Sequence, residues 1–365
     1  MPYKISGTKS ETSRIIILKE SDWSIESNTV VSGSGAYEVD SLVSGTKTVL
    51  AESTSGEFLG YGNVSAELYI IASGDRGVFG GGASGSGKVN VIDYITISTT
   101  GNASDFGDLT LERYDLGATS NGVTGRGVFG GGNAGTYNDT IDYVTITVPG
   151  DATDFGNLSA NRYDLTATSN GTSDRGLFAG GYTGSVTNVI EYITISLIGN
   201  ASDFGDLTEN RIYPAGTSNG TNDRGVFGGG YRTSEFNTID YVTISSISNA
   251  TDFGDLTDDR YGLAACSNNT NERGIFAGGY TDTNTIDYIT ISTTGDATNF
   301  GDLTAARQLL AATSNGTNDR GVVGGGSTGT TVNTIDYITI TSTGDATDFG
   351  DLTAARNGLA AVSNG

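Results

Sequence analysis

The residue types that carry out acid–base and nucleophilic chemistry form no evident catalytic set in this chain. Histidine is absent from all 365 residues, which excludes Ser-His-Asp and Cys-His nucleophiles. The single cysteine, Cys266, stands where equivalent segments carry threonine or valine, so we interpret it as a buried strand residue. Acidic residues number 42, yet no pair stands apart from a repeating pattern, as the two carboxylates of a glycosidase would. The sequence therefore predicts a protein that is not an enzyme.

Two glycine-containing patterns look like functional motifs but recur too often to be single sites. Asp-Phe-Gly occurs five times, with a sixth copy reading Asn-Phe-Gly, whereas a kinase uses one such triplet beside a lysine and a catalytic aspartate. Glycine runs recur without the Lys-Ser/Thr of a phosphate loop, so we expect them to permit close backbone approach. Acid-rich turns such as residues 295–302 offer carboxylates that suit Ca²⁺ but lack EF-hand spacing. Ca²⁺ therefore stays open, and no other metal or cofactor is expected.

Arginine is the charged residue whose positions are most strictly periodic. Twelve of the fourteen arginines fall into two series, and successive members of the first are 50, 49, 49, 49 and 47 residues apart. The first series is Arg76, Arg126, Arg175, Arg224, Arg273 and Arg320, and the second is Arg113, Arg162, Arg211, Arg260, Arg307 and Arg356. Because a guanidinium bridges carboxylates and carbonyls in crowded places, we interpret both series as structural links between neighbouring repeats.

These arginines belong to a unit of roughly 49 residues that occurs six times after about residue 75. Each unit contains an Ala-Thr-Ser-like segment, then Arg-Gly-Val-Phe, Ile-Asp-Tyr-Ile-Thr and Asp-Phe-Gly-Asp-Leu or close variants, which predicts four short strands. Four strands in a unit of this length form one blade of a β-propeller. We therefore expect an all-β chain with a six-bladed propeller over residues 71–365. The last segment, Leu359–Gly365, reads as a lone first strand that completes the first blade and closes the ring.

The unit resembles the kelch repeat. The likeness rests on a glycine pair after an apolar strand, then a tyrosine, a large aromatic residue, and an arginine seven residues after it. In the first unit these residues are Gly81, Gly82, Tyr94, Phe106 and Arg113. Phenylalanine stands where kelch repeats usually have tryptophan, so this is a divergent, kelch-like set. The resemblance implies the propeller fold and leaves the function open, because propellers host many activities.

Residues 1–70 lie outside the repeat and contain four of the five lysines and the only tryptophan, Trp23. Six β-rich segments separated by turn signals predict a small β-sandwich domain here. Residues 33–39 and 45–51 resemble the prealbumin or carboxypeptidase-regulatory sandwich, and residues 56–64 resemble modules that open many bacteriophage tail-fibre and virion-surface proteins. The resemblance implies that residues 1–70 attach the propeller to a particle by contacting other virion proteins.

The chain is strongly acidic, with a formal net charge of −23. Residues 71–365 carry 33 acidic against 14 basic residues. So acidic a surface repels phosphate backbones and anionic membranes, and no apolar run has the length of a membrane helix. We therefore expect neither nucleic-acid binding nor membrane insertion, while a homo-oligomer stays open.

The positions that differ between units mark the candidate binding surface. They lie between the glycines and the Ile-Asp-Tyr strand, and in antiparallel blades these loops emerge on one face, with the connections around Tyr114, Tyr163, Tyr213 and Tyr261. Tyrosine and arginine are favoured at recognition surfaces and stack on sugars and peptides. The predicted binding residues are Tyr137, Tyr182, Tyr231, Arg232, Phe236 and Tyr280.

Taken with the resemblance of residues 1–70, these features predict a non-enzymatic structural and binding protein of a bacteriophage virion. Its place would be a tail fibre, a tail tip or a capsid-attached position, on the virion surface. The propeller would display a face that recognises a host-surface glycan or protein. Two alternatives stay open, namely a secreted or cell-surface adhesin or kelch-type interaction scaffold and, third, a glycan-acting enzyme.

Overall fold

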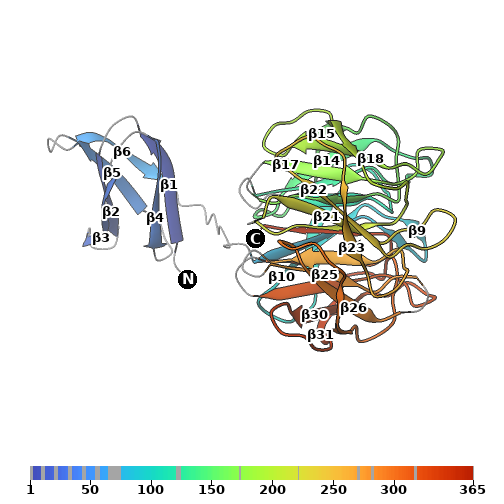
Figure 1. Cartoon of the computed structure of the whole chain (residues 1–365). Helices are drawn as coiled ribbons and strands as arrows, with labels where there is room; N and C mark the ends of the chain where they lie inside the picture. The colour runs from blue at the N-terminus through green and yellow to red at the C-terminus, as the bar shows by residue number, and fades with distance from the viewer. Residues whose placement is uncertain are drawn as a thin grey trace. The chain divides into compact units, whose positions relative to one another are not determined.

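The chain forms two units, Met1–Ala72 and Ser73–Gly365, each of which is described by itself (Figure 1). The computed structural model describes six strands within the first 64 residues by their backbone alone. From residue 75 it describes side chains as well, over residues 75–120, 125–171, 174–220, 222–268, 272–280, 283–315 and 319–364.

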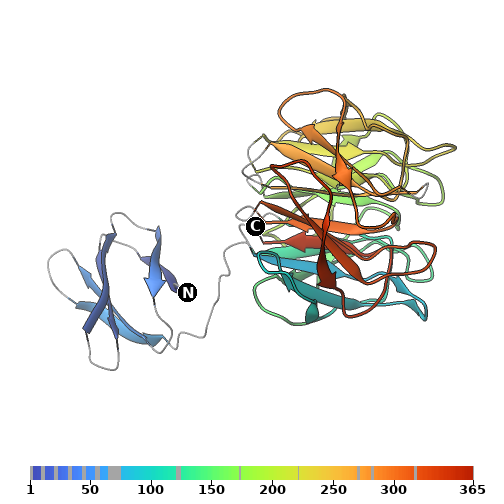
Figure 2. The same cartoon turned by 90° about the horizontal axis from the view of Figure 1, so that it is seen from below.

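The second unit is a six-bladed β-propeller, which confirms the predicted fold (Figures 1 and 2). Each blade is a four-stranded antiparallel sheet in which the Arg-Gly strand lies between the first strand and the Ile-Asp-Tyr strand. Blade 1 contains β32 (Ala360–Ser363), β7 (Arg76–Gly80), β10 (Val91–Thr96) and β11 (Ser104–Asp108). Blade 2 contains β12 (Gly117–Ser120), β13 (Arg126–Gly130), β14 (Thr140–Thr145) and β15 (Thr153–Asn157). Blade 3 contains β16 (Thr166–Thr168), β17 (Arg175–Ala179), β18 (Val189–Thr194) and β19 (Ser202–Asp206).

The remaining blades follow the same order along the chain. Blade 4 contains β20 (Ala215–Thr217), β21 (Arg224–Gly228), β22 (Thr238–Thr243) and β23 (Thr251–Asp255). Blade 5 contains β24 (Ala264–Ser267), β25 (Arg273–Ala277), β26 (Thr285–Thr290) and β27 (Thr298–Asp302). Blade 6 contains β28 (Ala311–Ser314), β29 (Arg320–Gly324), β30 (Thr334–Thr339) and β31 (Thr347–Asp351). A short hairpin, β8 (Ala83–Ser84) and β9 (Gly87–Lys88), extends from blade 1.

The ring is closed by strands from opposite ends of the propeller. β32 pairs antiparallel with β7, with Ala360 opposite Gly80 and Ser363 opposite Gly77. Figure 2 shows the red C-terminal strands beside the cyan first blade. The C-terminal segment thus supplies the innermost strand of blade 1, which leaves β7 with a hydrogen-bonded neighbour on both sides.

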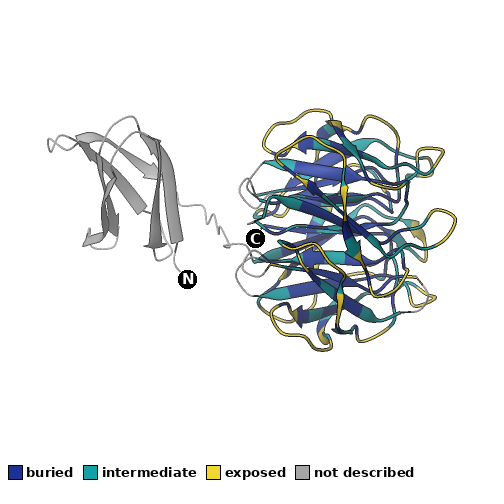
Figure 3. Ribbon diagram, viewed as in Figure 1, coloured by how far each residue is buried: buried dark blue, intermediate teal, exposed yellow. Residues whose placement is uncertain are grey.

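The apolar core lies between the blades. In the cluster between blades 2 and 3, Phe155 and Leu158 pack with Phe178 and Ile193. The phenylalanine of each Asp-Phe-Gly-like triplet also meets the tyrosine of its Ile-(Asp/Glu)-Tyr strand edge-on, as in the Tyr143–Phe155 pair with ring centroids 6.0 Å apart. Figure 3 shows the strands buried and the connecting loops exposed. The triplets are therefore part of the packing between blades, as the repeat predicts.

Cys266 belongs to this core. It lies in β24 and is buried, and this burial raises the pKa of its thiol to about 12. Because the thiolate is the reactive form, the side chain acts as a small apolar residue. The prediction of a buried strand cysteine is confirmed.

The second arginine series forms a buried ion pair in every blade. Arg113, in the connection to blade 2, donates to Asp142 Oδ2 of β14 at 2.8 Å and to the carbonyls of Gly131 and Thr140. Neither charged side chain of this pair has any exposed surface. The equivalent pairs are Arg162–Glu191, Arg211–Asp240, Arg260–Asp287, Arg307–Asp336 and Arg356–Asp93. Each pair ties the chain that leaves one blade to the sheet of the next.

The first arginine series links neighbouring blades differently. The guanidinium carbon of Arg76 lies 4.6 Å from the ring centroid of Tyr94, in the same blade. The same guanidinium donates to the carbonyl of Ile146, in blade 2, at 2.9 Å. All six members stack in this way on the tyrosine of the adjacent strand. Both arginine series are therefore structural.

The first unit contains two antiparallel sheets. Strand β1 (Tyr3–Lys9) pairs with β4 (Gly35–Leu42). The other sheet has the order β3-β2-β5-β6, formed by β2 (Ser13–Lys19), β3 (Ser24–Val31), β5 (Lys47–Ser53) and β6 (Phe58–Val64). How these sheets pack lies outside the described residues, so the β-sandwich stays a prediction. In the described part of the chain, no helix is long and apolar enough to cross a membrane.

Candidate functional site

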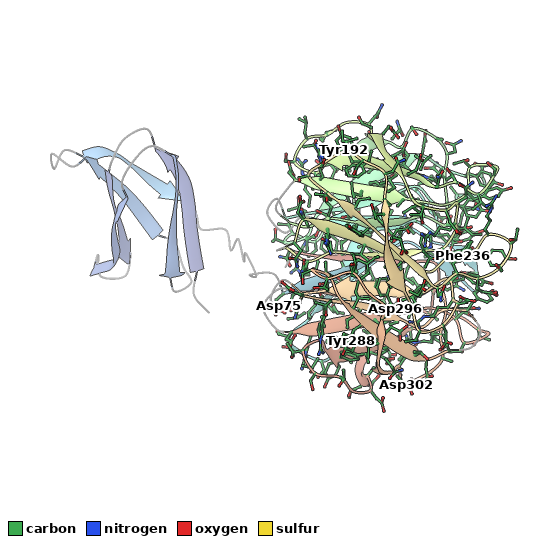
Figure 4. All side chains as sticks on the ribbon, viewed as in Figure 1. Asp75, Tyr192, Phe236, Tyr288, Asp296 and Asp302 are labelled. Atoms are coloured by element: carbon green, nitrogen blue, oxygen red, sulfur yellow. The ribbon has the colours of Figure 1, made fainter. Side chains whose placement is uncertain are left out.

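The variable loops and the connections between blades meet on one face of the propeller, which we call the loop face. Isolated bridges join the connection to the loop of the following blade in five blades, as between Tyr114 and Asn133 or Tyr163 and Tyr182, and in blade 5 the amide of Tyr280 donates to the carbonyl of Tyr261 at 2.7 Å. Figure 4 labels Phe236 on the loop face and Asp75 on the opposite face. The prediction that these two kinds of segment share a face is confirmed.

Six tyrosines from blades 2 to 5 form a tyrosine rim on the loop face. Tyr163 stacks on Tyr137, with ring centroids 4.8 Å apart, and both rings meet Tyr182 edge-on. Tyr261 stacks on Tyr280 at 4.3 Å and tilts against Tyr231 at 5.1 Å. The rim consists of Tyr137, Tyr163, Tyr182, Tyr231, Tyr261 and Tyr280. Blades 6 and 1 have Ser327 and Ala83 at the loop positions of Tyr182, Tyr231 and Tyr280, so the rim covers only part of the circle.

The rim brings together four of the six predicted binding residues. Tyr137 and Tyr182 meet through Tyr163, and Tyr231 and Tyr280 meet through Tyr261. Among the described residues, Arg232 and Phe236 join neither group: Arg232 is exposed and Phe236 is half-buried on the same loop. The sequence predicts that Tyr163 and Tyr261 lie on this face, but they are not among the predicted binding residues. Their position one residue after a buried arginine is the signal that could have identified them.

A ring of backbone hydrogen bonds surrounds the propeller axis near the rim. Its members lie two positions after the buried arginines, and each adopts a positive φ between 54° and 65°. Each backbone N–H donates to the carbonyl of the equivalent residue in the preceding blade, at 2.7–3.1 Å. The members of this axial ring are Asp115, Asp164, Tyr213, Gly262, Leu309 and Gly358. A positive φ costs each of the four non-glycine members about 1–3 kcal/mol. The backbone hydrogen bonds of the ring offset this cost and keep these residues in the left-handed conformation.

Three side chains of the axial ring gather into what we call the axial cluster: Asp115, Asp164 and Tyr213. The hydroxyl of Tyr213 donates to Asp115 Oδ2 at 3.4 Å, and the two carboxyl groups lie close enough for the charge of Asp115 to act on Asp164. Asp115 leans over Gly358 of the preceding blade, where a Cβ would clash with its Oδ1. The sequence predicted no acid pair outside the repeating pattern, and that prediction is wrong.

The axial cluster faces the rim. A Cβ added at Gly262 would meet Leu309 Cδ2 at 3.3 Å and the ring of Tyr280 at 3.7 Å. A side chain at this axial-ring position would therefore project toward the rim. The rings of Tyr213, in the cluster, and Tyr261, in the rim, lie 5.9 Å apart. The buried cluster thus adjoins the rim through Tyr213.

Burial sets the protonation of the axial cluster. Asp115 and Asp164 are only 9% and 3% exposed. Burial raises the pKa of Asp115 to about 7, and burial together with the charge of Asp115 raises the pKa of Asp164 to about 9. The same surroundings raise the pKa of Tyr213 far above its ordinary value. Near neutral pH the pair therefore keeps a proton that an ordinary carboxyl would have lost, as two carboxyls sharing a site do.

A cavity of about 130 Å³ lies on the axis beside this cluster. It is lined by the axial ring and by first-strand residues of all six blades, among them small residues at one equivalent position. These small residues are Ala118, Ala167, Gly216, Ala265, Ala312 and Ala361. Asp164 also lines the cavity, and its Oδ1 has no hydrogen-bond partner among the described residues. A buried carboxyl oxygen without a partner is costly, so this atom offers an open position for a donor.

The acid-rich turns do not gather into a metal centre within the described residues, where no group of three or more Asp, Glu, Cys or His side chains is placed to hold an ion. In the turn at residues 295–302, Asp296 Oδ1 accepts a hydrogen bond from the backbone of Asp255, in the neighbouring blade, at 3.1 Å. This carboxylate therefore has a structural partner between blades.

Comparison with known proteins supports the fold alone. Neither a protein-family profile nor a curated protein sequence matches the chain. The solved structure of YjhT is similar, with a TM-score of 0.59 and 11% identity over 75% of this chain and 94% of that one. The likeness to kelch repeats and to virion proteins stays a prediction.

Proposed function

We propose that this protein is a non-enzymatic binding protein of a bacteriophage virion, whose tyrosine rim recognises a host-surface glycan or protein. The observation that carries the proposal is the grouping of tyrosines from four consecutive blades on the loops that vary between repeats. Flat, partly exposed aromatic rings offer apolar area for stacking and hydroxyls for hydrogen bonds. The attachment of residues 1–70 to other virion proteins rests on their resemblance to virion modules.

The recognition surface is tested by removing two rim rings together. We expect the full-length protein to bind bacterial surface polysaccharides on an array or intact bacterial cells. The double variant Tyr231→Ala/Tyr280→Ala should bind at least about tenfold more weakly, because aromatic anchors dominate such interfaces. A matched control is Leu197→Ala/Ile198→Ala, which trims side chains that are 68% and 53% exposed at the other end of the blades. Equal binding by the rim variant, or release of sugar products by the protein, would contradict the proposal.

The virion assignment is tested separately from ligand binding. Mass spectrometry of purified phage particles should detect this chain in a fixed ratio to capsid or tail proteins. Particles that lack the chain would refute the virion part, and the binding result on the array would then favour the adhesin or scaffold alternative.

A further inference from the structure

We infer that the axial cluster is a binding site for a primary ammonium group, such as a lysine side chain or an amino sugar. The inference goes beyond the proposed recognition by the tyrosine rim and does not depend on it. Its starting point is Asp164, which is buried and lines the axial cavity, and whose Oδ1 has no hydrogen-bond partner in the described part of the chain. The other two members of the cluster supply further oxygen acceptors beside it.

The number and kind of acceptors fit an ammonium group. A primary ammonium has three N–H donors and no acceptor, and the cluster presents the carboxyl oxygens of Asp115 and Asp164 and the hydroxyl oxygen of Tyr213. The cavity of about 130 Å³ has room for roughly four water-sized groups. That volume suits an ammonium and the first carbons of its chain.

A metal ion fits this site less well. Ca²⁺ takes six to eight oxygen ligands, whereas the cluster supplies two carboxyl groups and one phenol. The six carbonyl oxygens of the axial ring already accept backbone hydrogen bonds from neighbouring blades. The aromatic rings of Tyr213 and Tyr261, 5.9 Å apart, favour an organic cation through cation–π attraction.

Binding of a cation should expel the proton that the empty pair holds. Near neutral pH the pair holds a proton, because burial and the closeness of the two carboxyls raise their pKa values. A bound ammonium stabilises both carboxylates as anions, since an opposite charge favours the ionised form. The titratable groups that face the pair, Tyr114, Tyr163 and Tyr213, have raised pKa values and stay neutral. Ammonium binding near pH 7 is therefore coupled to the release of up to one proton.

Calorimetric titration of the full chain with Nα-acetyl-lysine amide tests the inference. We expect saturable binding at pH 7, with proton uptake by the buffer revealed by heats that differ between phosphate and Tris. Nα-acetyl-norleucine amide, which lacks the ammonium, should give no binding. Binding of CaCl₂ or of Nα-acetyl-arginine amide without binding of the lysine probe would overturn the ammonium assignment, as would a complete absence of heat up to tens of millimolar probe.

Variants locate the binding at the axis. Asp164→Asn should weaken the lysine probe about 10- to 100-fold and abolish proton release, because hydrogen bonds to charged groups are the strong ones. Asp154→Asn removes an equal charge from an exposed position and should bind like the parent. Tyr213→Phe, which deletes only the hydroxyl, should weaken binding several-fold and covers the case in which Asp164→Asn does not fold. Unchanged affinity in both axial variants would overturn the site, and rim variants that still bind the probe would separate it from the proposed recognition surface.

Discussion

A charged pair is buried in each blade, and its contribution to stability depends on the presence of both partners. Arg113 has its carboxylate partner Asp142 and three backbone carbonyls around one guanidinium. Burial lowers the pKa of Arg113, and the charge of Asp142 opposes that effect. Taking two charges out of water costs several kcal/mol per ion, which the pair recovers only with good geometry. Removal of one partner therefore leaves the other charge buried, with its desolvation penalty no longer offset.

We expect Asp142→Ala to lower the free energy of unfolding by roughly 3–5 kcal/mol, because Arg113 keeps its buried charge without a counter-ion. Urea unfolding followed by tyrosine fluorescence measures the change. Asp154→Ala is the matched control, since Asp154 lies opposite Asp142 in the strand register but is exposed. A loss below about 1 kcal/mol in Asp142→Ala, equal to that of the control, would show that the ion pair is unimportant.

The sequence predicted the arginines of these pairs but not their partners. Asp142 lies between Ile141 and Tyr143 in a strand that is buried on both faces, so alternation of polar and apolar residues does not mark it. A β-bulge between Ile141 and Asp142 shifts the register there, and a bulge has no reliable signal in one sequence. The partner was therefore determined by packing between blades, which a single repeat does not show.

At the scale of elements, the strand that completes blade 1 comes from the far end of the chain. β32 places Val362 opposite Val78. Val362 and Leu359, the residue just before β32, are buried in the clusters on either side of blade 1. Without it, β7 becomes an open edge with unpaired backbone groups. The first blade then has three strands, while the other five keep four.

Deletion of residues 359–365 should therefore lower the melting temperature by roughly 10 °C. Loss of two buried apolar side chains costs about 1.5–3 kcal/mol each, and a domain of this size loses about 2–4 °C per kcal/mol. Circular dichroism during heating measures the shift, and hydrogen exchange should increase first in β7 and β10. A chain that ends at Asn364 is the control. An unchanged melting temperature after the seven-residue deletion would show that β32 contributes little to closure.

At the scale of the whole molecule, the propeller combines a large negative charge with two carboxyls that resist ionisation. Asp115 and Asp164 have pKa values raised to about 7 and about 9. Between about pH 4 and pH 9 the folded state therefore holds protons that the unfolded chain releases. Stability from these groups is present in acid and is lost as the pH rises through this window.

We expect the urea midpoint of the full chain to fall from pH 5 to pH 9. Repulsion within a chain of net charge −23 contributes to the same trend, so the informative measurement compares variants. Asp164→Asn should flatten the pH dependence, because it replaces a titrating carboxyl by an amide of the same shape. Parallel curves for the parent and Asp164→Asn would contradict the raised pKa values.

The six-bladed ring could be predicted from the sequence, but the axial cluster could not, because its residues come together only in the closed ring. Twelve periodic arginines and six copies of one strand pattern determine a six-bladed ring. The residues two positions after each arginine of the second series are Asp, Asp, Tyr, Gly, Leu and Gly. This variation at one repeat position is the sequence signal that the six blades differ at the axis. Asp115 and Asp164 are 49 positions apart, and they meet only because the closed ring brings equivalent positions to a common centre.

Closure by β32 also makes folding of the ring depend on a segment that is synthesised long after β7. The amide of Arg76 donates to the side chain of Asn364, 288 residues later. The ribosome adds about 5–20 residues per second, so β32 is synthesised roughly 15–60 seconds after β7. A chain that stops before β32 lacks the fourth strand of blade 1 and leaves β7 as an open edge. Ring closure thus distinguishes chains that include β32 from chains that stop before it.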